Sequence, residues 1–97
     1  MPLFVIVARD RPGSLALRKE TRPTHVEHLR SIGDRLKVAG PTMDANGDPD
    51  GSLVIIEADA IADAQEFADA DPYAKAGLFE TVDVRAWNAP LGVWSEA

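Results

Sequence analysis

Two short apolar runs constrain the fold of this 97-residue chain more than any other feature. In Leu3–Ala8 and Leu53–Ile56, the residues on both sides of an extended chain are apolar. The first run also consists largely of aromatic and β-branched side chains, which are typical of strands. A strand that is apolar on both sides is usually buried on both sides. The pattern therefore predicts two strands in the interior of a sheet.

Two helices are expected at residues suited to capping. Thr21 followed by Arg22-Pro23 resembles a helix start, with threonine as N-cap and proline in the first turn. This helix is predicted to run to about Leu36, after a separate helical turn over residues 14–20. Asp59 is predicted to cap a second helix.

Further strands are expected at 37–43 and 81–87, which gives the order strand, helix, strand, strand, helix, strand. This order predicts an α+β, ferredoxin-like fold: a four-stranded antiparallel sheet in the order 4-1-3-2, with two helices on one face. Both doubly apolar strands then occupy central positions. The whole chain, 1–97, is interpreted as one domain with a core at about 3–87 and a C-terminal arm at 88–97.

One face of this sheet lacks a covering layer, because two helices cover only one side. The same face of a second copy of the chain would bury its apolar residues. We therefore expect a homodimer through the helix-free face. The alternative is an open face that is merely somewhat apolar.

The composition narrows the possible partners. A formal net charge of −6 argues against binding to nucleic acid or to an anionic membrane surface. The chain has no cysteine, and its first apolar run is too short for a signal peptide or a membrane span. A cytoplasmic location is the default expectation. No cofactor is expected, and no metal, because the two histidines diverge around the helix and no third ligand is evident.

His25 is the first candidate for chemistry. On helical geometry it shares a narrow face with Leu29 and Ile32, so it is either a satisfied core group or a catalyst. Asp71 follows the second helix and precedes Pro72, which makes it a good N-cap. Packing of the two helices side by side can also bring Asp71 to His25. A carboxylate bonded to an imidazole orients it for general acid or base catalysis.

Four more residues are candidates for substrate binding. Arg22 can hold an anionic ligand or form a surface ion pair. Tyr73 can line the same cavity or anchor the turn after Asp71. Arg9 and Asp10 leave the first strand at its carboxyl end, where ligands often bind, although ordinary turn polarity explains them too.

Several motifs together resemble the YciI-like (YCII-related) family: "TRPTHVEHL", "VAGP", "GSLVIIEA" and "DADPYAKAGLFETVDVRAW". The resemblance extends from Leu3 to about Trp87. It implies a dimeric ferredoxin-like fold of the α/β-barrel type, with a histidine–aspartate active-site pair. The family's histidine matches His25, its aspartate matches Asp71, and its arginine matches Arg22. His28 has no counterpart in the motif and is interpreted as a surface residue.

Two kinds of function fit these features. The first is a small cofactor-independent enzyme in which His25, oriented by Asp71, transfers a proton in a lyase- or hydrolase-like step on a small molecule. The second is a non-catalytic module that binds a small molecule or only dimerises. A cavity that reaches His25 would favour catalysis or ligand binding over dimerisation alone.

Overall fold

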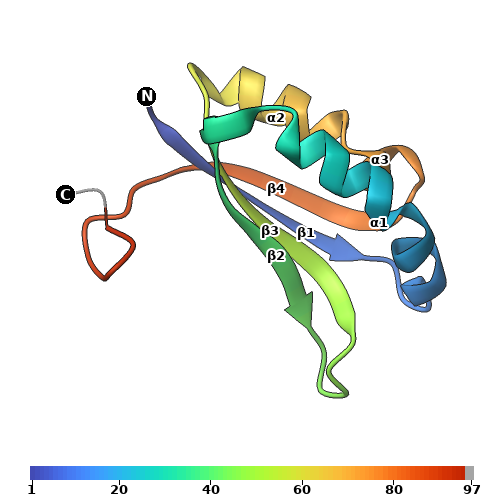
Figure 1. Cartoon of the computed structure of the whole chain (residues 1–97). Helices are drawn as coiled ribbons and strands as arrows, with labels where there is room; N and C mark the ends of the chain where they lie inside the picture. The colour runs from blue at the N-terminus through green and yellow to red at the C-terminus, as the bar shows by residue number, and fades with distance from the viewer. Residues whose placement is uncertain (96–97) are drawn as a thin grey trace.

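The computed structural model describes residues 1–95 and places one layer of helices over one face of a sheet (Figure 1). The elements in chain order are β1 (Leu3–Asp10), α1 (Leu15–Arg30), the 3₁₀ helix η1 (Gly33–Arg35), β2 (Leu36–Met43), β3 (Pro49–Glu57), α2 (Ile61–Asp69), α3 (Pro72–Lys75) and β4 (Phe79–Trp87). Within these residues, no helix is long and apolar enough to cross a membrane.

The sheet has the strand order β2-β3-β1-β4, and all neighbouring strands are antiparallel. The predicted α+β ferredoxin-like arrangement, with β1 and β3 in the centre, is therefore confirmed. In the register of the sheet, Ile6 lies opposite Val54 on one side and Val84 on the other. Cross-strand partners share a face, so these three residues point toward the same layer.

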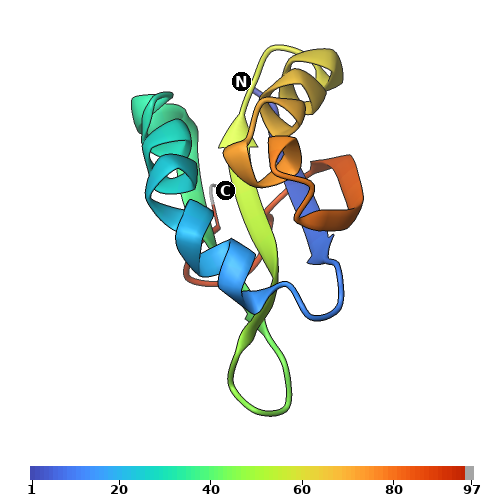
Figure 2. The ribbon, with the colours of Figure 1, turned by 90° about the vertical axis from the view of Figure 1, so that its right-hand side faces the viewer.

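The core lies between the sheet and the helices. Its buried members are apolar side chains of β1, β3, α1 and α2: Phe4, Ile6, Leu29, Val54, Ile56, Ala58, Ala64 and Ala68. Seen from the end of the sheet, α1 runs along one side of this layer and α2 and α3 along the other (Figure 2). The small residues Ala64 and Ala68 allow α2 to lie close to the strands.

The first helix differs from the sequence prediction at its start. It is continuous from Leu15, with Pro23 inside it and Thr21 not acting as a cap. The Thr21 carbonyl instead accepts a hydrogen bond from Thr24 Oγ1. The tertiary reason is Arg18, which is buried and paired with Asp10, so the residues before Thr21 are held in the helix. A local capping signal was therefore outweighed by a buried ion pair.

The end of α1 and the start of α2 also differ from prediction. The helix ends at Arg30 rather than near Leu36, because Gly33 adopts a φ of 58°, a left-handed conformation that terminates helices. Leu36 begins β2 instead. The N-cap of α2 is Ala60, one residue after the predicted Asp59, and no side chain caps it.

The helix-free face of the sheet carries apolar residues that are partly exposed. Val7 and Leu53, which lie directly opposite each other, are 36% and 37% exposed, and Val38 and Trp87 are similarly open. Beyond β4, the segment 88–95 leaves the end of the sheet and turns back on itself (Figure 1). The last two residues of the predicted arm, 96 and 97, lie outside the described residues.

Candidate active site

Asp71 is the N-cap of the short helix α3, as the sequence predicted. Its backbone is extended, Pro72 follows at the first helical position, and its Oδ1 accepts a hydrogen bond of 2.9 Å from the backbone N–H of Tyr73. The residue is buried, and α3 packs beside α1. The cap therefore fixes a carboxylate between two helices.

His25 lies on the inner face of α1 and meets that carboxylate. Its Nδ1 is 2.9 Å from both Asp71 oxygens, and only 7% of the residue is exposed. Because a carboxylate only accepts, Nδ1 donates, which leaves the lone pair of the neutral ring on Nε2. Nε2 has no hydrogen-bond partner among the described residues. No fully buried side-chain nitrogen or oxygen there lacks a partner, so solvent reaches Nε2.

Tyr73 forms one wall of the site. Its ring stacks on the His25 imidazole, with centroids 3.9 Å apart and planes 16° from parallel. The Arg18 guanidinium carbon lies 4.6 Å from the centroid of the tyrosine ring. Burial raises the pKa of Tyr73 above its ordinary value, although the positive charges of Arg18 and Arg22 oppose the shift. The phenol is therefore neutral at physiological pH, and it holds the imidazole in one orientation.

Arg18 and Ser52 are buried polar residues of the site that the sequence analysis missed. Nε and Nη2 of Arg18 donate to the two oxygens of Asp10 at 2.6 and 2.9 Å, and Nη2 also donates to Ser52 Oγ at 2.8 Å. Burial acts to lower the pKa of Arg18, but Asp10 outweighs it and the pKa is raised. Arg18 precedes His25 by about two helical turns, so extending the predicted helix would have placed both on one face.

A cavity of about 190 Å³ opens in front of His25. Arg22 and Tyr73 line it, together with Lys19 and Arg18. Its other lining residues are mostly small or apolar and come from α1, β2 and β3: Val26, Leu29, Ala39, Gly40, Pro41, Pro49 and Ser52.

The two candidates at the end of β1 have different surroundings. Asp10 does not line the cavity but supports Arg18 from behind, since the side chains of both residues are only 6% exposed. Arg9 is exposed and lines another cavity, next to the hairpin between β2 and β3. The structure therefore does not bring Arg9 to His25.

The interpretation of His28 as a surface residue was wrong. Its Nε2 lies 2.9 Å from the Phe67 carbonyl oxygen, and its ring stacks on that of Phe67 at 4.3 Å. His28 is half-buried between α1 and α2 because it packs against Phe67. The family motif gives no indication of this contact. Among the described residues, no group of three or more histidine, aspartate or glutamate side chains could hold a metal ion.

The model of the YCII-related domain family matches residues 2–88. The chain belongs to this family. Protein YciI of Escherichia coli is 44% identical over 95 residues, which cover 89% of this chain and 96% of that protein. An uncharacterised protein of Haemophilus influenzae is 32% identical over 88% of this chain and 95% of its own length.

One solved structure that is similar to this chain is that of an enzyme. It is 5-chloro-2-hydroxyhydroquinone dehydrochlorinase (TftG) of Burkholderia phenoliruptrix in complex with 2,5-dihydroxybenzoquinone. It is 36% identical, has a TM-score of 0.84, and the match covers 90% of this chain and 94% of that one. A NIPSNAP family protein of Agrobacterium tumefaciens, at 16% identity and a TM-score of 0.56, shares the fold, which is of the dimeric α/β-barrel type.

The two histidines are expected to hold opposite neutral tautomers. Asp71 fixes the proton of His25 on Nδ1, whereas the Phe67 carbonyl fixes that of His28 on Nε2. Nitrogen NMR of the side chains above neutral pH should show one ring of each kind. In Asp71→Asn the amide can donate to Nδ1, so His25 should lose its preference while His28 keeps its own. Two Nε2-protonated rings in the unmodified protein would contradict the assignment.

Proposed function

We propose that this protein is a small-molecule enzyme in which His25 transfers a proton and Asp71 orients the imidazole and stabilises the imidazolium that forms. The observation that carries the proposal is the hydrogen bonding of Nδ1 to a buried carboxylate while Nε2 is open to a cavity. A histidine held only for packing has no need of an accessible ring nitrogen. A small cavity with one reactive nitrogen fits catalysis or ligand binding better than dimerisation alone.

The proposed step is a lyase-like elimination. Nε2 of His25 accepts a proton from the substrate, and the electron pair of the broken bond expels a leaving group as an anion. Asp71 stabilises the imidazolium that forms, and Tyr73 keeps the ring aimed at the substrate. The imidazolium then returns its proton to water or to the departing group. The substrate therefore loses only the proton and the leaving group.

The likeness to TftG supports this class of reaction, because that relative is a dehydrochlorinase crystallised with a quinone. A chlorinated hydroquinone is therefore the first substrate to test.

The purified protein should release chloride from 5-chloro-2-hydroxyhydroquinone. His25→Asn should lower kcat/KM by about 10²- to 10⁴-fold, the usual contribution of a positioned acid or base. Asp71→Asn should also cause a large loss, because asparagine still caps α3 but carries no charge to stabilise the imidazolium. Chloride release followed over time gives the rates.

The matched control is His28→Asn, which changes the only other histidine and leaves the cavity intact. It should retain turnover, and circular dichroism should show all three variants folded. Turnover by His25→Asn at the unmodified rate would contradict the proposed role. Absence of chloride release from the unmodified protein would contradict an elimination of this kind.

We also propose that the protein is a homodimer through the helix-free face of the sheet. The partly exposed Val7, Val38 and Leu53 support it, because adjoining apolar side chains open to water on a sheet are costly. The segment 88–95, which follows β4, has three apolar residues that are 80–98% exposed: Leu91, Val93 and Trp94. A second copy of the chain would therefore have further apolar surface to cover. The cavity opens on the helical side, which leaves it free in such a dimer.

Light scattering at micromolar concentration should give twice the 10.5 kDa chain mass. Val7→Glu combined with Leu53→Lys places opposite charges on neighbouring strands of the helix-free face, so the fold should persist while the dimer dissociates. Ile61→Lys changes a more exposed apolar residue, on α2 and away from this face, and should leave the dimer intact. A monomeric unmodified protein would overturn the proposal.

A further inference from the structure

The cavity in front of His25 differs in charge from the rest of the molecule. The protein has a net charge of −6, yet none of the described residues that line this cavity is acidic. Its ionisable groups are three cations, Arg18, Lys19 and Arg22, together with His25 and Tyr73. By contrast, the cavity beside the β2–β3 hairpin contains four aspartates and a glutamate. The positive lining is therefore local and is not a consequence of composition.

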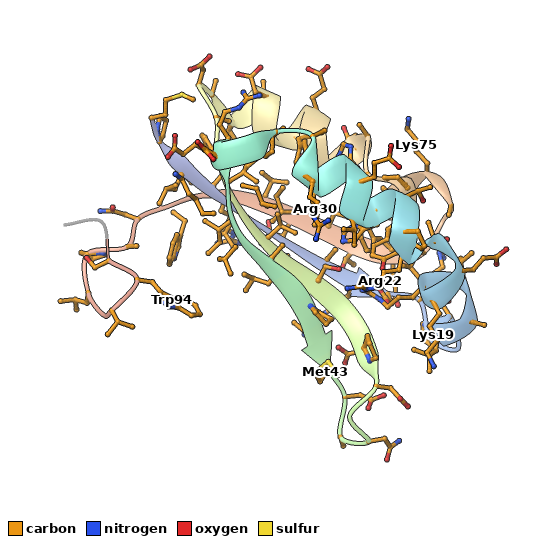
Figure 3. All side chains as sticks on the ribbon, in the orientation of Figure 1. Lys19, Arg22, Arg30, Met43, Lys75 and Trp94 are labelled. Atoms are coloured by element: carbon orange, nitrogen blue, oxygen red, sulfur yellow. The ribbon has the colours of Figure 1, made fainter. Side chains whose placement is uncertain are left out.

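Two of the three cations are available to a ligand. The charge of Arg18 is already paired with that of Asp10, whose carboxylate Arg18 binds through two nitrogens. Lys19 and Arg22 make no hydrogen bond or ion pair with any described residue. They stand one turn apart in the N-terminal half of α1 (Figure 3), and both line the same opening. The carboxylate of Asp71 lies behind His25, and a protonated His25 would neutralise its charge.

The remaining walls indicate the size and character of the ligand. Val26, Leu29, Ala39 and two prolines make them largely apolar. A volume of about 190 Å³ is well below the ~300–1,000 Å³ of sites for drug-sized molecules. One ring, or an aliphatic group of that size, would fill this space beside the Tyr73–His25 stack.

We infer that the substrate is a small monocyclic acid, ionised at neutral pH, whose anionic oxygen binds between Lys19 and Arg22 while its ring faces His25. The inference rests on the proposed function for the meaning of "substrate", but the binding it describes needs no turnover. An anion at this position also stabilises protonated His25, which would make Nε2 a better acceptor for the proton removed in the elimination.

Benzoate and benzamide provide a probe pair of nearly equal shape that differs in charge. The ring signals of the two histidines are readable by NMR because the chain has no others. Benzoate should shift the His25 signals saturably and leave those of His28 unchanged, and benzamide should bind at least tenfold more weakly. Added salt should weaken benzoate binding and leave benzamide binding unchanged.

Variants identify the responsible cation. Arg22→Gln should weaken benzoate binding about tenfold or more and Lys19→Gln about two- to fivefold, with no change for benzamide. Arg30→Gln is the matched control, since Arg30 is an exposed arginine of α1 about 12 Å further along the axis and does not line the cavity.

Equal binding of the two probes, no shift of the His25 signals by benzoate, or unchanged binding in Arg22→Gln would overturn the inference. These outcomes are separable from failure of the proposed function. Arg22-dependent benzoate binding without chloride release would leave the anion site standing and remove the elimination. Chloride release that is unchanged in Arg22→Gln would leave the elimination standing and remove the anion site at Arg22.

Discussion

The carboxylate of Asp71 is the group on which the site depends. One of its oxygens caps α3 through the Tyr73 N–H, and both contact His25 on α1. The Asp71 side chain thus begins α3 and joins it to α1. The capping bond fixes the direction of the carboxylate, and the carboxylate fixes the histidine tautomer. The structural and the proposed catalytic roles of Asp71 are therefore two uses of the same geometry.

A second buried contact supports the first. The Asp10–Arg18 pair holds the start of α1 against the end of β1, and Arg18 lies over the Tyr73 ring that stacks on His25. Both contacts lie at the same end of the molecule, where the strand β1 leaves the sheet and α1 begins (Figure 1). The sheet separates this end of the helical layer from the face proposed for dimerisation. One small fold can in this way provide a cavity at His25 and a separate apolar surface.

Much of this was accessible from the sequence because the relevant signals are local. The continuous apolar run Leu3–Ala8 predicted β1, Asp71-Pro72 predicted the cap of α3, and the helical stripe placed His25 inward. The parts that failed depend on contacts between separate elements, which no local pattern encodes. The ion pair of Arg18 with Asp10 kept residues 15–20 helical against the local signal at Thr21. Likewise, the bond from His28 to the Phe67 carbonyl joins helices that no short motif relates.

The most direct test of this account is a crystal structure of the protein grown with 2,5-dihydroxybenzoquinone, the molecule bound by TftG. The account predicts a ring oxygen or carbon of the ligand next to Nε2 of His25, with Nδ1 still bonded to Asp71 and the Arg22 side chain at the ligand's anionic oxygen. A ligand bound only on the helix-free face, or a His25 ring turned away from Asp71 in the complex, would contradict it.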